Sequence, residues 1–505
     1  MCTLLIRADA SEEIGAGHVM RCLALAQAWQ DSGGRAMFAM NACREAMRSR
    51  LRSEGIEVAI LDCDPGGGKD ARATAKLAQE NAAKWIAVDG YFFGTEYQKR
   101  IKDEGFSLLF VDDNAHTDHY RADLVLNQNL HACEEMYAKR EPYTRLLLGS
   151  RYALLRREFL HWRDGKSESP EKATRLLVTL GGADPDNVTS KVISAIEELD
   201  LPELETKVVV GPLNKNLPAL QAQLYRNRQK ITLLTERVDM PELLAWADAA
   251  VAGAGSTSWE LCFMGVPSLL IVLAENQIHV ADKLEKEGAA VNLGECTRRS
   301  SHAVAEQVRQ VLLTKTLRID LAEHARGIVD GRGAQRVVRH LRGSSLKLRP
   351  AQSSDCKLLW GWANDPEVRA GSFSNAPILW EEHVAWFTQK MAEPNTILLL
   401  GIDGEGEPVG QVRLDLLARD EAVVHVSVAS PRRGSGFGRT LIGQVVDEFC
   451  FGNGIRVFHA YIRPENQRSI KAFEHSGFAL IGHARVRGTD SLHFVRRMAS
   501  RAIAP

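Results

Sequence analysis

The sequence predicts an α/β protein of three domains, and three observations support this prediction. Short apolar runs alternate with helical segments from residue 3 to about residue 335, an order that builds parallel sheets covered by helices on both faces. A chain of 505 residues is too long for a single hydrophobic core, because a domain averages roughly 150 residues. A third region has longer strand-like runs and a glycine-rich loop. We expect domains at residues 1–160, 161–342 and 343–505.

The composition is that of an ordinary folded protein and argues against several kinds of partner. Hydrophobic residues make up 45% and charged residues 25%, so each domain can bury a core. The net charge of −1 provides no overall positive potential that would attract nucleic acid or an anionic membrane. Nine cysteines lack CxxC pairs and zinc-site spacing, and no stretch reaches the ~20 apolar residues of a membrane span. We expect a cytoplasmic protein with reduced thiols, small-molecule ligands and no metal.

The opening segment predicts a ligand site at the start of a helix. An apolar run at residues 3–7 is followed by Gly15, Gly17 and His18. The glycines let the backbone turn close to a ligand, so that free N–H groups can meet a phosphate or an oxyanion. The positive helix end disfavours a protonated imidazole, which leaves His18 able to accept a proton. His18 is therefore a candidate general base, and an ordinary first-turn residue is the alternative.

Further apolar runs continue this βα pattern through the first domain. Strands are expected at 36–40, 58–61, 85–88 and 108–111, with helices at about 43–54, 70–82 and 94–104. Ligands of such folds bind beyond the carboxyl ends of the strands. Acidic residues follow two strands, at 89–91 and 112–114, and solvated turns are their commoner use. Tyr91 lies beside the expected His18 cleft and is a candidate substrate contact.

The second domain follows a polar linker at 164–170 and carries two glycine loops. A strand at 175–180 runs into Gly181-Gly182, and the segment 252–261 delivers Ser256, Thr257 and Ser258 to a helix N-terminus, which suits a pyrophosphate. By spacing alone, Thr257 to Glu260 is a capping box. The segment 275–279 offers polar groups for recognising hydroxyls.

Residues 1–335 resemble the two-domain GT-B fold of the UDP-GlcNAc-dependent transferase of peptidoglycan synthesis. The segments 7–26, 147–159, 180–189 and 275–277 more closely resemble the UDP-sugar hydrolases of pseudaminic acid biosynthesis. This resemblance implies two Rossmann-like domains in a GT-B arrangement.

The resemblance also implies roles for individual residues. His18 would activate water for attack at the anomeric carbon of a UDP-linked amino sugar, releasing UDP. Glu260 would bind the ribose, which gives it a role beside capping. Gly90 departs from the bulkier residue expected before Tyr91. The implied substrate-binding residues are Gly17, Tyr91, Arg156, Gly182, Asn187, Ser256, Glu260, Asn276 and Gln277.

The third domain follows a break at 342–345 and carries a second phosphate-loop pattern. Strand-like runs occupy 346–349, 396–402, 409–416 and 423–428. Arg433, Gly436 and Gly438 then satisfy R-x-x-G-x-G before a helix expected at 439–451. Successive backbone N–H groups of such a loop can wrap a pyrophosphate. A glycine pattern alone is weak evidence, but its place between a strand and a helix strengthens it.

This loop and the segment 464–478 resemble the two conserved motifs of the GNAT acetyltransferases. The segments 362–369 and 383–387 are similar to the acetyltransferase of the same pseudaminic acid pathway. The resemblance implies a mixed α/β GNAT domain that uses acetyl-CoA as co-substrate. The implied cofactor-binding residues are Val426, Val428, Arg433, Gly434, Gly436, Gly438, Arg439 and Asn466.

One position departs from the GNAT pattern. Phe473 stands where many of these enzymes have a tyrosine that protonates the departing thiolate. By residue type, His425, Ser427 and Tyr461 are candidate proton donors, although packing or hydrogen bonding within the strands is the commoner use. An inactive CoA-binding domain is the alternative.

The two halves together predict a bifunctional enzyme. In the pathway they resemble, the 4-amino group of a UDP-linked trideoxy-altrose derivative is acetylated, and UDP is then removed. A GT-B glycosyltransferase with an unrelated GNAT domain is one rival hypothesis. A sensor that binds both ligands without turnover is another. The oligomeric state is not predicted.

Overall fold

A computed structural model describes residues 2–498, except 11–14, 42, 44, 163–168, 183, 212–213, 226–228, 236–237, 296–298, 343–345, 404–405, 419, 435 and 487. The chain forms two compact units, one ending at Val338 and the other beginning at Arg339. All but the first residue of the predicted break at 342–345, and all but the end of the predicted linker at 164–170, lie outside the described residues.

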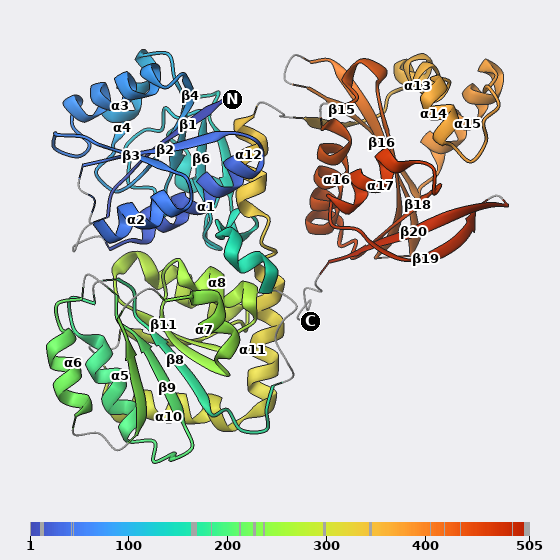
Figure 1. The fold of residues 1–505 in the computed structure, drawn as a ribbon. Helices are drawn as coiled ribbons and strands as arrows, with labels where there is room; N and C mark the ends of the chain where they lie inside the picture. Colours follow the sequence, from blue (N-terminus) through green and yellow to red (C-terminus); the bar gives the residue numbers. More distant parts are fainter. Residues whose placement is uncertain are drawn as a thin grey trace. The chain divides into compact units, whose positions relative to one another are not determined.

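The first unit begins with an all-parallel sheet in the order β3-β2-β1-β4-β5-β6-β7 (Figure 1). Its strands are β1 (Thr3–Ala8), β2 (Arg35–Met40), β3 (Glu57–Ile60), β4 (Ala83–Asp89), β5 (Ser107–Val111), β6 (Leu124–Asn127) and β7 (Arg145–Leu148). The crossover helices are α1 (Gly17–Asp31), α2 (Glu45–Ser53), α3 (Gly68–Glu80) and α4 (Thr95–Asp103). Strand β1 is buried along its whole length, as expected for a central parallel strand. The predicted α/β class is confirmed.

The centre of this sheet is a topological switch point. Strands β1 and β4 are neighbours, but β1 leads through α1 to β2 on one side, whereas β4 leads through α4 to β5 on the other. Such a reversal leaves a crevice beyond the carboxyl ends of the two central strands, and ligands bind there. Helix α1 begins beyond the end of β1, and Asp89 is the last residue of β4. The topology therefore brings His18 and Asp89 to the same place.

A second parallel sheet follows in the first unit, in the order β10-β9-β8-β11-β12-β13. Its strands are β8 (Arg175–Thr179), β9 (Glu205–Val209), β10 (Lys230–Leu234), β11 (Ala249–Gly253), β12 (Ser268–Val272) and β13 (Val291–Glu295). The helices are α5 (Val188–Glu197), α6 (Leu217–Leu224), α7 (Met240–Trp246), α8 (Thr257–Met264), α9 (Ile278–Lys286), α10 (Ser301–Leu313), α11 (Lys315–Ile328) and α12 (Gly333–Leu341), of which α12 continues into the second unit.

Two apolar clusters pack against the second sheet. One joins α5 and α10 to it through residues such as Val192 and Val308, and the other joins α8 through Trp259 and Phe263. The switch point of this sheet lies between β8 and β11. These two strands run into the two glycine loops that the sequence predicts as the UDP site.

The second unit is built on a mixed sheet in the order β14-β15-β16-β17-β18-β20-β19. Its strands are β14 (Lys347–Pro350), β15 (Thr396–Ile402), β16 (Pro408–Ala418), β17 (Glu421–Val428), β18 (Val457–Ile462), β19 (Ala479–Val486) and β20 (Thr489–Arg497). The helices are α13 (Cys356–Ala363), α14 (Pro366–Gly371), α15 (Trp380–Ala392), α16 (Phe437–Asn453) and α17 (Gln467–Glu474).

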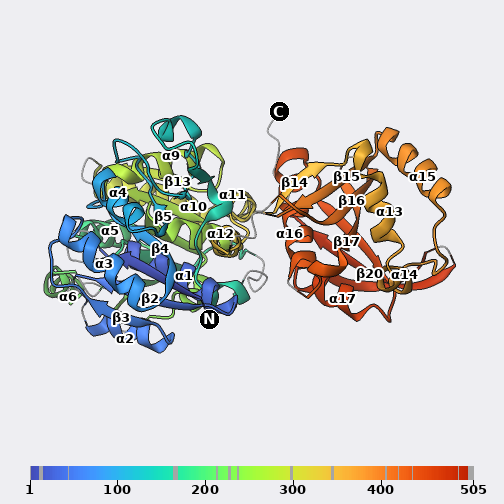
Figure 2. The same ribbon diagram turned by 90° about the horizontal axis from the view of Figure 1, so that it is seen from above.

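Helices cover both faces of this sheet (Figure 2). On one face α16 and α17 bury Leu441 and Ile470 against it, and on the other face α13 and α15 bury Leu359 and Phe387. Strands β17 and β18 are parallel and pair only at Glu421–Val423. Beyond this point the two strands diverge, which leaves the end of β17 unpaired on that side.

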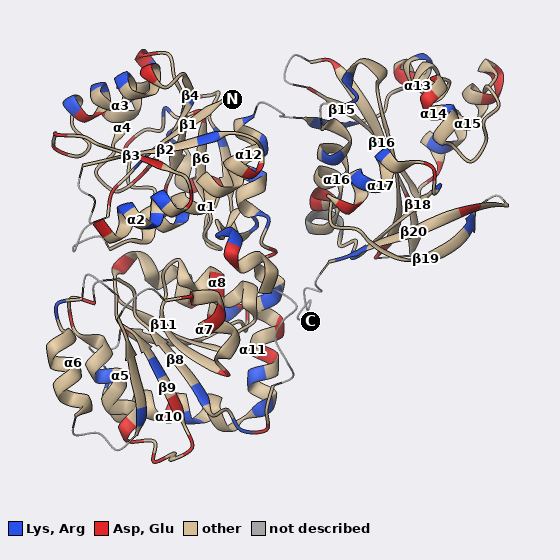
Figure 3. Ribbon diagram, in the orientation of Figure 1, with Lys and Arg blue, Asp and Glu red and all other residues tan. Residues whose placement is uncertain are grey.

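Charged residues of both signs occur along the helices of both units (Figure 3). This distribution agrees with the net charge of −1. Over the described part of the chain, no helix is long and apolar enough to cross a membrane.

Candidate active sites

His18 lies at the first switch point and is tied to a carboxylate. It is the second residue of α1, and its side chain is buried, with 7% exposed. Its Nδ1 atom lies 2.7 Å from Oδ1 of Asp89, which is itself fully buried. Nη2 of Arg21 also lies 3.1 Å from Nδ1, but the shorter contact is to a carboxylate that, when ionised, only accepts hydrogen bonds. Nδ1 therefore carries the hydrogen, and in the neutral imidazole Nε2 keeps the lone pair. The helix start and the strand end thus define the tautomer of this histidine.

Arg21 clamps the same carboxylate. Its Nε donates to Oδ2 of Asp89 at 2.6 Å and its Nη2 to Oδ1 at 2.6 Å, while Nη1 donates to Asp113 at 2.9 Å. Burial opposes the charge on Asp89, but Arg21 and His18 outweigh it and hold the pKa of that carboxyl well below its ordinary range. Asp89 therefore stays ionised and keeps accepting from His18.

The interpretation of residues 89–91 and 112–114 as solvated turns is wrong for Asp89 and Asp113. Both carboxylates are buried and paired with Arg21. Arg21 is not among the predicted site residues. A usable signal was present, because positions 18 and 21 share one face of a helix, so a cation there meets the same strand ends as His18.

Tyr91 connects this network to the second sheet. Its hydroxyl donates to Asp113 at 3.2 Å and accepts from Nδ2 of Asn276 at 2.8 Å. Its ring meets the His18 ring edge-on at 5.0 Å. Burial and Asp113 raise the pKa of Tyr91, so the hydroxyl remains a donor. Two predicted sugar contacts, Tyr91 and Asn276, are thus in direct contact.

Gly90 has a structural reason for departing from the expected bulkier residue. Its φ is 149°, a conformation that other residues rarely adopt. A Cβ atom at this position would also lie 3.0 Å from the ring of Phe93. The glycine therefore allows the chain to turn from β4 towards Tyr91.

The loop before α8 lies close to the His18 loop. A Cβ atom on Gly17 would be 3.8 Å from Oγ of Ser256. No side chain caps the N-terminus of α8 at Ser256. The N–H groups of Ser258 and Trp259 already donate to the carbonyls of Gly255 and Ser256, so the N–H groups of Ser256 and Thr257 are the ones left to meet a ligand. Gln277 lies beside Gly255, and its Oε1 accepts from the backbone N–H of Leu273 at 3.0 Å. The arrangement offers an anion site opposite His18.

The other predicted phosphate loop, before α5, is different. Asp184 accepts from the backbone N–H groups of Val188 at 2.8 Å and Thr189 at 2.9 Å, so a carboxylate already occupies this helix end. Gly182 packs against the backbone of residue 211. Asn187 adopts a left-handed conformation with φ of 51°, and its buried Oδ1 has no hydrogen-bond partner among the described groups. Of the two loops, the α8 loop is the better anion site.

The capping-box interpretation of Thr257 to Glu260 is wrong. Glu260 instead accepts from Nη2 of Arg156 at 2.8 Å, and Arg156 also contacts Glu158 at 3.0 Å. The spacing of a capping box also places the glutamate one turn into a helix, where a cation from another segment can reach it. Arg156 thereby ties the segment after β7 to α8.

In the second unit, Arg433 is anchored at the start of α14. Its guanidinium pairs with Asp365 at 2.8 Å and Glu367 at 3.2 Å, and its Nε donates to the carbonyl of Val428 at 3.1 Å. Arg433 therefore holds the loop against β17 and α14. Its charge is already matched by these carboxylates.

The loop itself is shaped to receive an anion. Gly434 and Gly436 have φ of 79° and 83°, and no side chain caps α16 at Gly436. Among the described residues, the first turn of α16 therefore has no side-chain cap, and its N–H groups can meet an anion. Asn466 caps α17 by accepting from Ser469 at 3.1 Å. Val426 and Val428 lie beyond the point where β17 and β18 part.

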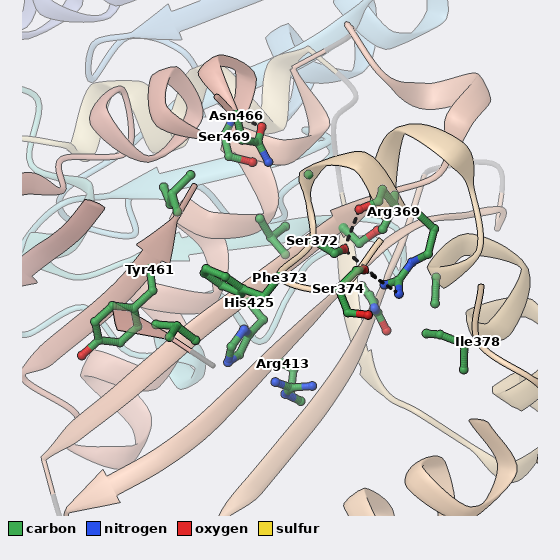
Figure 4. Close-up of a pocket in the computed structure, with 18 of the residues that line it drawn as sticks. Arg369, Ser372, Phe373, Ser374, Ile378, Arg413, His425, Tyr461, Asn466 and Ser469 are labelled. Carbon is green, nitrogen blue, oxygen red and sulfur yellow. Dashed lines mark hydrogen bonds between the residues drawn. The ribbon is translucent and has the colours of Figure 1, made fainter. Parts of the chain in front are cut away.

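A cavity of about 600 Å³ opens between α14, α15 and the strands of this unit (Figure 4). Its lining includes Arg369, Arg413, His425, Ser427, Tyr461 and Phe473. Phe473 is buried and meets Phe478 edge-on at 5.0 Å. Among the described residues, no group of three or more His, Cys, Asp or Glu side chains is placed to hold a metal ion.

Comparisons with known proteins identify both parts. Residues 175–329 match the family described as the glycosyltransferase family 28 C-terminal domain, and residues 345–479 match the acetyltransferase (GNAT) domain family. The fold is therefore a pair of Rossmann-like domains of the GT-B type followed by a mixed α/β GNAT domain, as predicted.

Three relatives extend this result. The UDP-2,4-diacetamido-2,4,6-trideoxy-beta-L-altropyranose hydrolase of Campylobacter jejuni is 26% identical over 57% of this chain and 98% of its own. The spore coat polysaccharide biosynthesis protein SpsG of Bacillus subtilis is 27% identical over 49% of this chain and 73% of its own. An uncharacterised protein of Methanocaldococcus jannaschii is 24% identical over 94% of this chain and 96% of its own. The predicted resemblance to a UDP-sugar hydrolase fused to a GNAT domain is confirmed.

Proposed function

We propose that the chain is a bifunctional enzyme of pseudaminic acid biosynthesis. Residues 1–160 and 161–342 hydrolyse UDP-2,4-diacetamido-2,4,6-trideoxy-beta-L-altropyranose, the substrate named for the Campylobacter relative, to the free sugar and UDP. Residues 343–505 transfer an acetyl group from acetyl-CoA to the 4-amino group of the UDP-sugar precursor. The observation that carries the hydrolase half is the buried His18–Asp89 pair facing the open loop at Ser256.

His18 is the general base of the hydrolysis. Asp89 fixes the hydrogen on Nδ1, so Nε2 takes a proton from water as the water oxygen attacks the anomeric carbon. The bond between that carbon and the phosphate oxygen breaks, and UDP leaves with the electron pair. A positioned base contributes about 10²–10⁴-fold to such a rate.

The second domain holds the UDP in this scheme. The open N–H groups of α8 and the Ser256 hydroxyl receive the diphosphate. Glu260, oriented by Arg156, accepts from the ribose hydroxyls. Gly182 also faces the diphosphate, and Tyr91, Asn276 and Gln277 line the sugar pocket. Gly17 and Asn187 are the remaining predicted substrate-binding residues.

The GNAT domain supplies the acetylation. The 433–439 loop receives the pyrophosphate of acetyl-CoA, and its glycine conformations and open N–H groups support this assignment. Arg369 and Arg413 line the cavity together with one carboxylate, Glu382, and Arg413 is itself paired with Asp415 at 3.0 Å, so Arg369 is the cation that an acceptor can meet. This cation suits an acceptor that carries a nucleotide diphosphate.

The direct experiment uses the full chain, the 4-amino UDP-sugar and acetyl-CoA, with both products followed by NMR. We expect the N-acetylated UDP-sugar first, and then UDP with the free sugar. Steady UDP release without any added acceptor distinguishes hydrolysis from glycosyl transfer. UDP release that requires an acceptor alcohol contradicts the hydrolase assignment, and ligand binding without products supports a sensor instead.

A further inference from the structure

His425 faces the cavity of the GNAT domain. His425 and Ser427 line the cavity from β17; Val424 also reaches its lining, but it is buried in the core cluster with α16. The cross-strand partner of His425 is Arg413 on β16, and Figure 4 shows the two side chains next to each other. The side chain of His425 is 44% exposed, so a ligand in the cavity can reach it.

Asp415 orients this histidine. Its Oδ2 lies 2.9 Å from Nε2 of His425 and 3.0 Å from Nη2 of Arg413, and its Oδ1 accepts from Thr396 at 3.3 Å. Burial opposes the charge on Asp415, but His425 and Arg413 hold its pKa well below the ordinary range. An ionised Asp415 accepts the hydrogen on Nε2 and leaves the lone pair on Nδ1.

The surroundings keep His425 neutral. Burial lowers its pKa, the nearby cations Arg413 and Lys390 lower it further, and Asp415 opposes them. A neutral imidazole at physiological pH can accept a proton. The other titratable side chains that line the cavity are Tyr461 on β18, Arg369 on α14, and Glu382 and His383 on α15.

Two further polar atoms lack partners in the same cavity. Oγ of Ser427 and Oε1 of Gln411 are buried without a hydrogen bond among the described groups. Ser427 and Gln411 are cross-strand neighbours, and both line the cavity. Buried polar atoms are usually satisfied, so these two oxygens point to a ligand that brings hydrogen-bond donors. An amine is such a ligand.

The position along β17 matches the chemistry. His425 lies two residues beyond Val423, where β17 and β18 part, and directly before the residues expected to hold acetyl-CoA. Phe473 lines the same cavity and has no proton to donate. We infer that His425, oriented by Asp415, is the catalytic proton carrier of acetyl transfer, and that Ser427 and Gln411 accept hydrogen bonds from the acceptor amine.

The acetyl-transfer step rests on the acetyltransferase half of the proposed function. The nitrogen of a neutral amine attacks the thioester carbonyl carbon, the C–N bond forms, and the C–S bond breaks with its electron pair going to sulfur. The proton lost by nitrogen goes to Nδ1 of His425 and returns from there to the thiolate. The products are an amide and a thiol, and His425 ends neutral.

The test measures acetyl transfer to the 4-amino UDP-sugar, and to a panel of simple amines, by wild type and the variants His425→Gln and Asp415→Asn. We expect kcat of His425→Gln to fall about 10²–10⁴-fold, with no change in the Kd of CoA measured by calorimetry. The wild-type rate should rise with pH through a pKa below the ordinary histidine value. In Asp415→Asn this rise should move to lower pH, because Asp415 raises the pKa of His425.

Two controls separate the possible failures. His483→Gln changes an exposed histidine on β19 that does not line the cavity, and it should leave both activities unchanged. UDP release from the diacetamido UDP-sugar by His425→Gln reports that the first unit is folded, and its unchanged Kd for CoA reports that the second unit is folded. If His425→Gln acetylates the amine at the wild-type rate and with the wild-type pH profile, the role of His425 is contradicted, but the acetyltransferase proposal is not. Wild type that acetylates no amine would contradict the acetyltransferase proposal and this assignment together.

Discussion

The chain has two histidine–aspartate pairs, and they differ in how far their side chains are buried. In the first unit, Asp89 is fully buried, and Arg21 contacts both of its oxygens while His18 is 7% exposed. In the second unit, Asp415 is 27% exposed, Arg413 contacts only its Oδ2, and His425 is 44% exposed. Both aspartates have pKa values held well below the ordinary range.

The difference indicates which pair supports the fold as well as the chemistry. Removing a buried partner leaves an uncompensated charge inside the protein, whereas a half-exposed charge is solvated by water. Asp89 therefore has a structural and a positioning role together. Asp415 acts chiefly through His425.

The largest expected effect follows from this contrast. Asp89→Asn should lower the unfolding free energy by about 3–5 kcal/mol, because Arg21 loses one of its two buried counter-charges, and UDP release should fall with it. Asp415→Asn should cost about 1 kcal/mol or less, since the pair is partly exposed. Denaturant unfolding of the two variants measures both values. Equal losses of unfolding free energy in Asp89→Asn and Asp415→Asn would contradict the distinction between a structural and a chiefly positioning aspartate.

Acid should weaken the first unit through the same carboxylate. The folded pKa of Asp89 lies below its unfolded value of about 3.9, so its contribution is fully present above that pH and is lost as the pH falls towards the folded pKa. Calorimetric scans from neutral pH down to about pH 3 should therefore show a steeper loss of Tm in wild type than in Asp89→Asn, across the window below the unfolded pKa. Parallel curves would contradict the lowered pKa.

A smaller effect is expected at the link between His18 and the second sheet. Tyr91→Phe removes a donor to Asp113 and an acceptor for Asn276, each hydrogen bond being worth about 0.5–1.5 kcal/mol. We expect a higher KM for the UDP-sugar and little change in acetyl transfer. Steady-state kinetics of the two reactions measure this. Phe92→Leu, at the exposed neighbouring residue, is the matched control.

Much of the fold could be predicted from the sequence, because buried parallel strands read as short apolar runs. The expected strands at 36–40, 85–88 and 108–111 correspond to β2, β4 and β5 within a few residues. Strands β6 and β7 were not expected. The strands span four residues each and their apolar runs only three, too short to separate from loop segments by periodicity.

The candidate sites were predicted less completely, because their partners come together only through sheet topology. His18 has a local signal in the glycines before it, but Asp89 lies 71 positions away and meets it only because β1 and β4 are neighbours. Asp415 likewise meets His425 through the register of β16 and β17. The capping-box error at Glu260 has the same origin, since Arg156 reaches it from 104 positions away.

The most direct test of the account asks whether the two histidines act separately. Wild type, His18→Gln and His425→Gln are each incubated with the 4-amino UDP-sugar and acetyl-CoA, and every product is followed by NMR over time. We predict that His18→Gln accumulates the N-acetylated UDP-sugar without releasing UDP at the wild-type rate, and that His425→Gln leaves the amine unacetylated while still hydrolysing the diacetamido UDP-sugar when it is supplied. UDP release by His18→Gln at the wild-type rate would contradict the account.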